Sequence, residues 1–421
     1  MKTSYFAVQV TLACIILSAP VAHDFSSLEA VASADSTDYW PTSGWRYSTP
    51  EEQGINSAYL ENMKDYINSQ NLFIDSVIVV RHGYVILEEY GNPYQQNNTH
   101  YLASVTKSFS SALIGIALEE GYIDSISHKV LDFFPNRSFA NMSAWKQAIT
   151  LEHLLAMTSG IPFSDEVDSW QMHDSNDAVQ FVLDRSVTSE PGTVWSYSSG
   201  GSHLLSAIVN VTTGMDTLEF AREHLFDPLG ISALHWGRDA MGIPWGHAYL
   251  FMRALDMAKF GYLYLHSGMW DGQQIVPAEW VAESTSMNTY FGESWGYGYQ
   301  WWIQNETGTY DCYHYCASGA LGQKIYVIPN YDMVVVFTAS SEHYDEIEDY
   351  MLHQFILRAR LRMSGDVYWD WTVDIFDLAV VATQFGRPPP PISDSRADIN
   401  KDGTVDIFDV VVVAVHFGET S

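Results

Sequence analysis

The sequence predicts an α+β domain followed by a small α-helical module, and three observations lead to this fold class. Strand patterns lie at both ends of residues 35–363 with helix patterns between them, which favours one sheet built from distant parts of the chain over a βαβ series. Residues 364–421 carry a repeat instead, because Thr372-Val-Asp-Ile-Phe-Asp377 recurs as Thr404-Val-Asp-Ile-Phe-Asp409. Residues 1–34 have the composition of a leader.

The elements of the α+β domain follow from hydrophobic periodicity. Two strands joined by a turn at His82 are expected within residues 76–87, and a second hairpin within residues 323–337. A helix is expected over residues 104–120, and a closing helix over residues 344–361. The apolar stripe of the first helix consists of Phe109, Leu113, Ile116 and Ala117.

Composition and charge exclude some classes of function. Apolar residues make up 47% of the 421 residues, which is enough for a large core. The formal net charge of -31 argues against a nucleic-acid partner, because a phosphate backbone requires a basic surface.

The first residues resemble a secretory signal. Lys2 is followed by an apolar run from Phe6 to Ala19 and then by small residues such as Ala22 and Ala34. The run is too short to span a bilayer, and no later segment is long and apolar enough to do so. We therefore expect a secreted or cell-surface protein without a membrane span after signal removal; the alternative is an uncleaved anchor.

Two cysteines follow the leader, Cys312 and Cys316. In an exported chain this pair favours a short disulfide. A metal site that includes His314 is the alternative, although three such residues within five positions fit tetrahedral geometry poorly.

Ser104 and Lys107 are the first candidate catalytic residues. They lie one helical turn apart, so the lysine amine can lie near the serine hydroxyl. A partly desolvated lysine has a lowered pKa and can take the proton of a serine, which makes the serine nucleophilic. The structural alternative is an N-cap serine beside a solvated lysine, but a lysine in the first turn opposes the helix dipole.

Two further clusters give this pair a context. Tyr197 lies in a turn-rich segment, and Ala317-Ser318-Gly319 precedes an expected strand. With these three motifs the sequence resembles the serine β-lactamase and penicillin-binding-protein superfamily, especially its class C-like esterase and amidase branch, which includes 6-aminohexanoate-dimer-hydrolase-like proteins. The resemblance covers most of residues 45–360, including Leu154–Gly160 and Tyr297–Trp302.

The resemblance implies a β-lactamase/DD-peptidase-like fold, an antiparallel sheet with a helical subdomain. It implies that Ser104 is the acylated nucleophile, that Lys107 is its base and that Tyr197 relays the proton of the leaving group. A phenol between cationic neighbours is expected to have a lowered pKa, so that Tyr197 could act as a phenolate base. No cofactor is implied for catalysis.

The third motif is expected to bind the reacting carbonyl. By resemblance, the backbone N–H groups of Ser104 and Ala320 form the oxyanion hole, since two donors must converge on the developing charge. Ser318 supplies the hydroxyl of the motif, and Gly319 allows strand and substrate to approach closely.

The sequence departs from the family pattern at two places. Ser199 stands where the middle motif has Asn, and its hydroxyl can bond Lys107 or a substrate amide. Ala317 stands where the third motif has a cation that helps to hold a substrate carboxylate. The missing cation favours ester or amide substrates without a carboxylate at that position.

Other conspicuous side chains are expected to be structural or, for the histidines, exposed. The histidines have no partner pattern, and the tryptophans are expected in the core, with a pocket-lining ring as the alternative. These residues are His247, His314, His343, Trp295, Trp301 and Trp302.

The C-terminal repeat has the ligand spacing of a Ca²⁺ loop. Alternating oxygen ligands, with Gly403 at the sharp turn, precede an expected helix from Val410 to Phe417. The first copy has Tyr368 and Trp371 at two of these positions, so we expect weaker or distorted binding there. The expected ligands are Asp398, Asn400, Asp402, the Thr404 carbonyl, Asp406 and Asp409 in the second loop, and Asp366, Asp370, Asp374 and Asp377 in the first.

This tandem arrangement resembles a dockerin module, which implies a cohesin-like protein partner. The Ile-Phe pairs at 375–376 and 407–408 fit either a docking surface or the small interior. The whole sequence thus indicates a secreted serine hydrolase acting on a small ester or amide. The alternatives are a β-lactamase or D-Ala-D-Ala-type peptidase, and a catalytically silent binding protein.

Overall fold

The computed structural model describes most of the chain up to residue 360. The described residues are 39–292, 294–305, 312–340, 347–360, 378, 381, 397, 399, 405 and 407–416. The expected leader, residues 1–34, lies outside them, as does His343.

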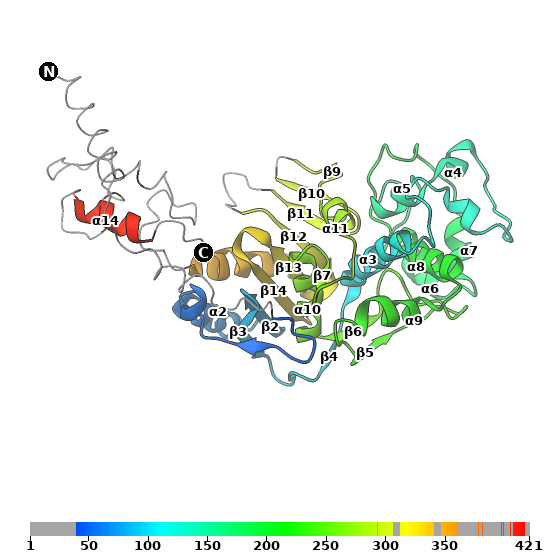
Figure 1. The fold of residues 1–421 in the computed structure, drawn as a ribbon. Coiled ribbons are helices and arrows are strands. Elements are labelled where there is room, and N and C mark those ends of the chain that lie inside the picture. The colour runs from blue at the N-terminus through cyan, green and yellow to red at the C-terminus, as the bar shows by residue number, and fades with distance from the viewer. Residues whose placement is uncertain are drawn as a thin grey trace, which may run out of the picture. The chain divides into compact units, whose positions relative to one another are not determined.

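Nine of the described strands form one sheet, in the order β1-β3-β2-β14-β13-β12-β11-β10-β9 (Figure 1). Only the β1–β3 pair is parallel among these strands, and the other neighbours are antiparallel. In sheet order the strands are Arg46–Tyr47, Tyr84–Tyr90, Ile74–Arg81, Met333–Ala339, Gln323–Ile328, His314–Gly319, Trp302–Gln304, Trp295–Tyr297 and Thr289–Tyr290.

The centre of the sheet joins the two ends of the domain, as the sequence predicted. The β2–β3 hairpin turns at His82-Gly83, and β13 and β14 form the second hairpin. Strand β14 pairs with β2 in a register that places Phe337 opposite Val77. The α+β fold class is therefore confirmed.

Both faces of the central strands are buried. Alternate residues face two cores, with Val335 in one and Val334 in the other. On the first face lie α2 (Ser57–Ser69) and the helical segment that starts with α12 (Ile347–Met351). On the second lies α10 (Ala254–Leu265), where Gly261 permits close packing, since a Cβ there would lie 2.6 Å from Val334.

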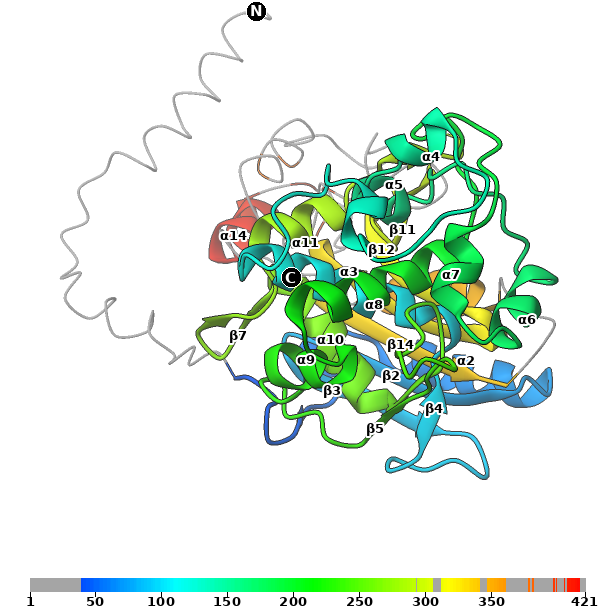
Figure 2. The same ribbon diagram turned by 90° about the vertical axis from the view of Figure 1, so that its right-hand side faces the viewer.

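A helical subdomain packs beside the sheet around α3 and α8. In Figure 1 these helices gather to the right of the sheet, and Figure 2 shows α3 and α8 side by side. The helices are α3 (Thr106–Glu119), α4 (Ala144–Ala148), α5 (Leu151–Leu155), α6 (Asp168–His173), α7 (Ala178–Leu183), α8 (Ser199–Thr213) and α9 (Thr217–Ala221).

Smaller elements complete the domain. They are the sheet of β4 (Thr99–Tyr101), β6 (Leu250–Arg253) and β5 (Leu234–Trp236), the hairpin of β7 (Met269–Trp270) and β8 (Gln273–Gln274), and α11 (Ala278–Ser284).

Two expected helices differ in detail from the structure. The helix expected from Ser104 begins only at Thr106, after a 3-10 turn over Ala103–Val105, because Ala103 has a φ of +46° that no α-helix accommodates. The closing helix is described from Ile347 to Ala359, but it changes from α to π to 3-10 geometry along its length.

The expected disulfide is not formed. Cys312 and Cys316 are not joined by a disulfide, and both are buried. Cys316 lies two residues into β12, and an extended strand rises about 3.3 Å per residue, which carries it away from Cys312. Within the described ranges, no three His, Cys, Asp or Glu side chains gather as a metal site, so the cysteine–histidine alternative has no support there.

Helix α14 (Ile407–Val415) agrees with the helix expected after the second loop, and Val413 packs with Val381, Ala397 and Val405. Considering only the residues that the structure describes, none of the helices is both long and apolar enough to cross a bilayer.

Candidate active site

The structure brings Ser104 and Lys107 into contact. Lys107 Nζ lies 2.8 Å from Ser104 Oγ. Ser104 occupies the 3-10 turn in front of α3, and no side chain caps that helix, so the N-cap alternative for Ser104 is wrong. The turn places the hydroxyl above the lysine amine, where a proton can pass directly between them.

Lys107 is held in a buried environment that favours its neutral form. The side chain is 1% exposed, and burial lowers the pKa of Lys107 to about 8, with the Asp165 charge acting in the opposite direction. Besides Ser104, Nζ donates to Ser199 Oγ at 3.1 Å and to the His247 carbonyl at 3.1 Å. The expected lowering of the lysine pKa agrees with this environment.

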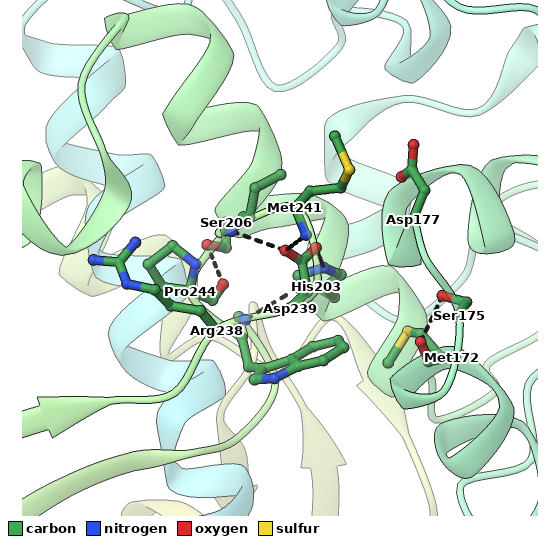
Figure 3. A network of polar contacts seen from close by, with 12 residues as sticks. Met172, Ser175, Asp177, His203, Ser206, Arg238, Asp239, Met241 and Pro244 are labelled. Carbon is green, nitrogen blue, oxygen red and sulfur yellow. Dashed lines mark hydrogen bonds and ion pairs between the residues drawn. The ribbon is translucent and has the colours of Figure 1, made fainter.

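The segment that carries His247 is fixed by a buried polar network. His203 Nε2 lies 3.1 Å from Asp239 Oδ2, and Asp239 Oδ1 accepts from Met241 N at 2.9 Å (Figure 3). Ser206 Oγ of α8 donates to the Pro244 carbonyl at 2.7 Å, also drawn in Figure 3. These bonds tie residues 239–247 to α8, so the His247 carbonyl is held against Lys107.

Side chains on α3 hold the same segment from its other side. Ser110 Oγ donates to the Gly246 carbonyl at 2.7 Å. A Cβ at Gly246 would lie 2.4 Å from the Ser202 carbonyl, so only glycine fits between the helices. His247 is buried, which fits the expectation of a structural role, although its backbone carbonyl contacts Lys107.

Tyr197 lies beside the pair, but not as a phenolate. Lys107 Nζ is 4.8 Å from the centroid of its ring. Burial raises the pKa of the Tyr197 phenol well above its usual value, while a hydrogen bond with Ser104 acts in the opposite direction. The pKa is thus raised and not lowered as expected, because loss of hydration outweighs the hydrogen bond with Ser104.

The third motif, Ala317-Ser318-Gly319, forms the end of β12 and lies next to Ser104. A Cβ on Gly319 would lie 3.0 Å from Ser104 N and 2.5 Å from the Leu102 carbonyl, so the strand approaches the 3-10 turn more closely than any side chain allows. Ala320 follows directly and is exposed, while Ser318 is half-buried. The motif and the expected nucleophile are thus adjacent.

Ser199 lies beneath this region rather than on its surface. Its hydroxyl accepts from Lys107 and donates to Asp165 Oδ2 at 2.8 Å. Asp165 was not identified from the sequence, since an acid in a polar loop carries no distinguishing signal. Ser199 therefore connects Lys107 to a carboxylate.

A lysine lies beside the third motif, although Ala317 itself carries no charge. Lys324 of β13 stands directly opposite Ser318, and its Nζ donates to Ser318 Oγ at 2.9 Å. The slot at residue 317 does lack a cation, but the sequence pattern did not reveal Lys324, because it considered only the strand that carries the motif. A three-residue turn between the two strands, Ala320–Gly322, is the signal that pairs Ser318 with Lys324.

These residues surround one cavity of about 420 Å³, a size suited to a small substrate. Trp301 is fully buried as expected, but Trp295 and Trp302 line the cavity, so the core assignment is wrong for those two. The lining residues are Ser104, Asp165, Tyr197, Trp295, Trp302, Cys316, Ser318, Gly319, Ala320, Lys324 and Asp349.

In the C-terminal repeat, the described residues include one expected Ca²⁺ ligand, Asp409. Its buried Oδ1 accepts from Ile399 N at 2.7 Å, which joins the two ends of the second loop. The other nine expected ligands lie outside the described residues: Asp366, Asp370, Asp374, Asp377, Asp398, Asn400, Asp402, Thr404 and Asp406.

Comparison with known proteins agrees with this geometry. Residues 61–357 match the Beta-lactamase family, and residues 364–417 match the Dockerin type I domain. The chain is 25% identical to an uncharacterized protein of Alkalihalophilus pseudofirmus over 62% of this chain and 82% of that protein. It is 23% identical to the 6-aminohexanoate-dimer hydrolase of Paenarthrobacter ureafaciens over 63% of this chain and 72% of the hydrolase.

Among solved structures, EstCE1, a hydrolase with promiscuous acyltransferase activity, has the same fold. The TM-score is 0.61 at 15% identity, over 73% of this chain and 98% of EstCE1. The family match spans well over half of the 421 residues and includes every residue of the cavity. The chain therefore belongs to the Beta-lactamase family and carries a dockerin type I domain after that region.

Proposed function

We propose that this chain is a secreted serine hydrolase that cleaves a small ester or amide through an acyl-enzyme on Ser104. The observation that carries this proposal is the 2.8 Å contact between Ser104 Oγ and the buried Lys107 amine. A serine becomes nucleophilic when a neighbouring base takes its proton, and burial favours the neutral amine that such a base requires. The similarity to the 6-aminohexanoate-dimer hydrolase of Paenarthrobacter ureafaciens is consistent with a hydrolase.

In the first step, neutral Lys107 accepts the Ser104 proton while Oγ attacks the substrate carbonyl. The resulting ammonium is held by Ser199 Oγ and the His247 carbonyl, the two acceptors that it already contacts. The negative charge forms on the carbonyl oxygen, for which the N–H groups of Ser104 and Ala320 are the proposed donors.

Tyr197 acts in the second step as a neutral acid. A phenol with a raised pKa keeps its proton until a more basic atom needs it, and the departing alkoxide or amine is such an atom. Lys107, positioned over the ring, then returns a proton to the phenolate. Water hydrolyses the acyl group on Ser104 by the same transfers in reverse.

The C-terminal domain is proposed to tether the enzyme to a cohesin-like protein. Dockerin type I domains bind calcium in general. The all-oxygen set from Asp398 to Asp409 suits Ca²⁺, and the Asp409–Ile399 bond holds the ends of the second loop together as a wrapped ion requires. Calcium would thus stabilise the docking module and take no part in hydrolysis.

Covalent labelling tests the catalytic proposal. A fluorophosphonate probe should modify Ser104 in the folded protein, detected by peptide mass spectrometry, and a Ser104→Ala variant should take up no label. Short-chain nitrophenyl esters should be hydrolysed faster than a chromogenic cephalosporin. An unlabelled Ser104 would favour a silent binding protein, whereas cephalosporin turnover without ester cleavage would favour a β-lactamase.

A further inference from the structure

The loop that carries Asp165 buries little surface of its own. Residues 164–167 are exposed, although Asp165 lines the active-site cavity. Two bonds close the loop into a turn: Asp168 N donates to the Ser164 carbonyl at 2.6 Å, and Ser164 N donates to Asp168 Oδ2 at 2.6 Å. These bonds keep the shape of the turn, but its position at the cavity must be fixed by neighbouring residues.

Arg185 holds this loop at both of its ends. Its Nε donates to the Pro162 carbonyl at 2.9 Å, and its Nη2 donates to Asp168 Oδ2 at 2.9 Å. Because the guanidinium is planar and rigid, two such bonds fix the ends of the loop relative to each other. The same Asp168 oxygen accepts from Ser164 N, so the ion pair is continuous with the turn.

Phe163 connects the loop to α8. Arg185 Cζ lies 5.6 Å from the centroid of the Phe163 ring, within reach of a cation–π contact. A Cβ at Gly200 of α8 would lie 2.6 Å from this ring, so only glycine lets the ring lie so close to the helix. Gly200 directly follows Ser199, and the loop is thereby placed beside the hydroxyl that contacts Lys107.

The position of Asp165 determines where the Ser199 hydroxyl sends its proton. Ser199 Oγ donates to Asp165 Oδ2 at 2.8 Å, and Ser199 N lies 3.3 Å from Asp165 Oδ1. A hydroxyl that donates to the carboxylate offers a lone pair to Lys107 Nζ, which lies 3.1 Å away. This acceptor and the carboxylate charge both favour the ammonium form of Lys107.

We propose that Arg185 is a positioning residue of the active site: it keeps Asp165 bonded to Ser199 and thereby sets how readily Lys107 takes the Ser104 proton. This inference rests on the proposed function, because it concerns the base of the Ser104 site. Arg185 does not line the cavity, so it acts through the loop and touches no reacting atom.

Two other titratable groups face Lys107, and both stay neutral where the lysine titrates. Burial raises the pKa of the Tyr197 phenol and lowers the pKa of the His247 imidazole, whereas the pKa of Lys107 is about 8. Among the described residues, Asp165 is therefore the charge that controls this titration. Without Arg185 the carboxylate is no longer held on Ser199, so the pKa of Lys107 should fall.

Titration of Lys107 by NMR tests the inference without turnover. In protein isotopically labelled at the lysine Cε, the Lys107 signal is identified by its absence from Lys107→Arg. We expect Arg185→Met to lower its titration midpoint by about 0.5 pH unit or more, and to cause no further shift in an Asp165→Asn background. An unshifted midpoint, or an equal shift in the Asp165→Asn background, would overturn the inference.

Arg137→Met is the matched control, because Arg137 has the same kinds of contact elsewhere. It pairs with Asp177 at 2.7 Å, its Cζ lies 5.9 Å from the Phe134 ring centroid, and its side chain is 24% exposed against 23% for Arg185. Asp177 caps α7 and does not belong to the Asp165 loop. The control should leave the midpoint of Lys107 in place, and an equal shift would contradict a specific role of Arg185.

Asp168→Asn breaks the same ion pair from its other side and decides the question if the Tm shows that Arg185→Met does not fold. The amide oxygen can still accept from Ser164 N, so the midpoint should move in the same direction by a smaller amount. An unmoved midpoint would again count against the inference. Failure of Ser104 to take the fluorophosphonate label would instead count against the proposed function alone, because the NMR titration needs no reaction.

Discussion

Two lysine–serine pairs of the site differ in how their residues are brought together. Ser104 and Lys107 meet through local spacing, since they are three residues apart in one turn. Ser318 and Lys324 meet through the register of two strands. The contact of the first pair could be predicted from its spacing, and the second pair was missed. Local spacing thus brings the proposed catalytic pair together, whereas the second pairing is defined only by the sheet.

Replacing the lysine of the local pair should have the largest effect. Lys107→Arg keeps the positive charge and much of the volume, but a guanidinium stays protonated and cannot take the Ser104 proton. We expect kcat/KM for a nitrophenyl ester to fall roughly 10³-fold or more. Steady-state kinetics measures this, and near-normal activity would mean that another group is the base.

Loss of the Tyr197 phenol should slow hydrolysis most for substrates whose leaving group needs a proton. Tyr197→Phe removes the proposed acid, so hydrolysis of an anilide should fall about 10²-fold or more. Nitrophenolate leaves without a proton, and cleavage of its ester should fall much less. The measurement divides the fold-loss in anilide hydrolysis by the fold-loss in nitrophenyl ester hydrolysis. Equal losses for both substrates would assign Tyr197 a purely structural role.

The pH profile reports on Lys107 itself. Burial lowers the pKa of Lys107 to about 8, and the base must be neutral to act, so kcat/KM for a neutral ester should rise with pH and level off above about 8. Because the Asp165 charge raises this pKa, Asp165→Asn should move the midpoint to lower pH. A midpoint that does not move in the variant would show that Lys107 does not control the profile.

Much of the fold and part of the site could be predicted because their causes are local. The apolar runs of the β2–β3 and β13–β14 hairpins and the apolar stripe of α3 can be recognised from neighbouring residues. The pKa of Tyr197 could not be predicted, since it depends on burial by residues distant in sequence. The same holds for Trp295 and Trp302, because strand alternation does not tell a cavity-facing side from a core-facing one.

The smallest expected effect is the coupling between Ser318 and Lys324, the pair that joins β12 and β13. If Lys324 acts by polarising the Ser318 hydroxyl, the two residues should not contribute independently to hydrolysis. A double-mutant cycle of Ser318→Ala and Lys324→Met, read as kcat/KM for a nitrophenyl ester, should show the double variant about three-fold or more better than the product of the single losses. The same cycle with Ser318→Ala and Lys64→Met should show independence, because Lys64 lies on α2 and pairs with Glu61 and Glu89. Independent contributions from Ser318 and Lys324 would mean that the lysine acts by its charge alone, and that the 2.9 Å contact between them does not tune the hydroxyl.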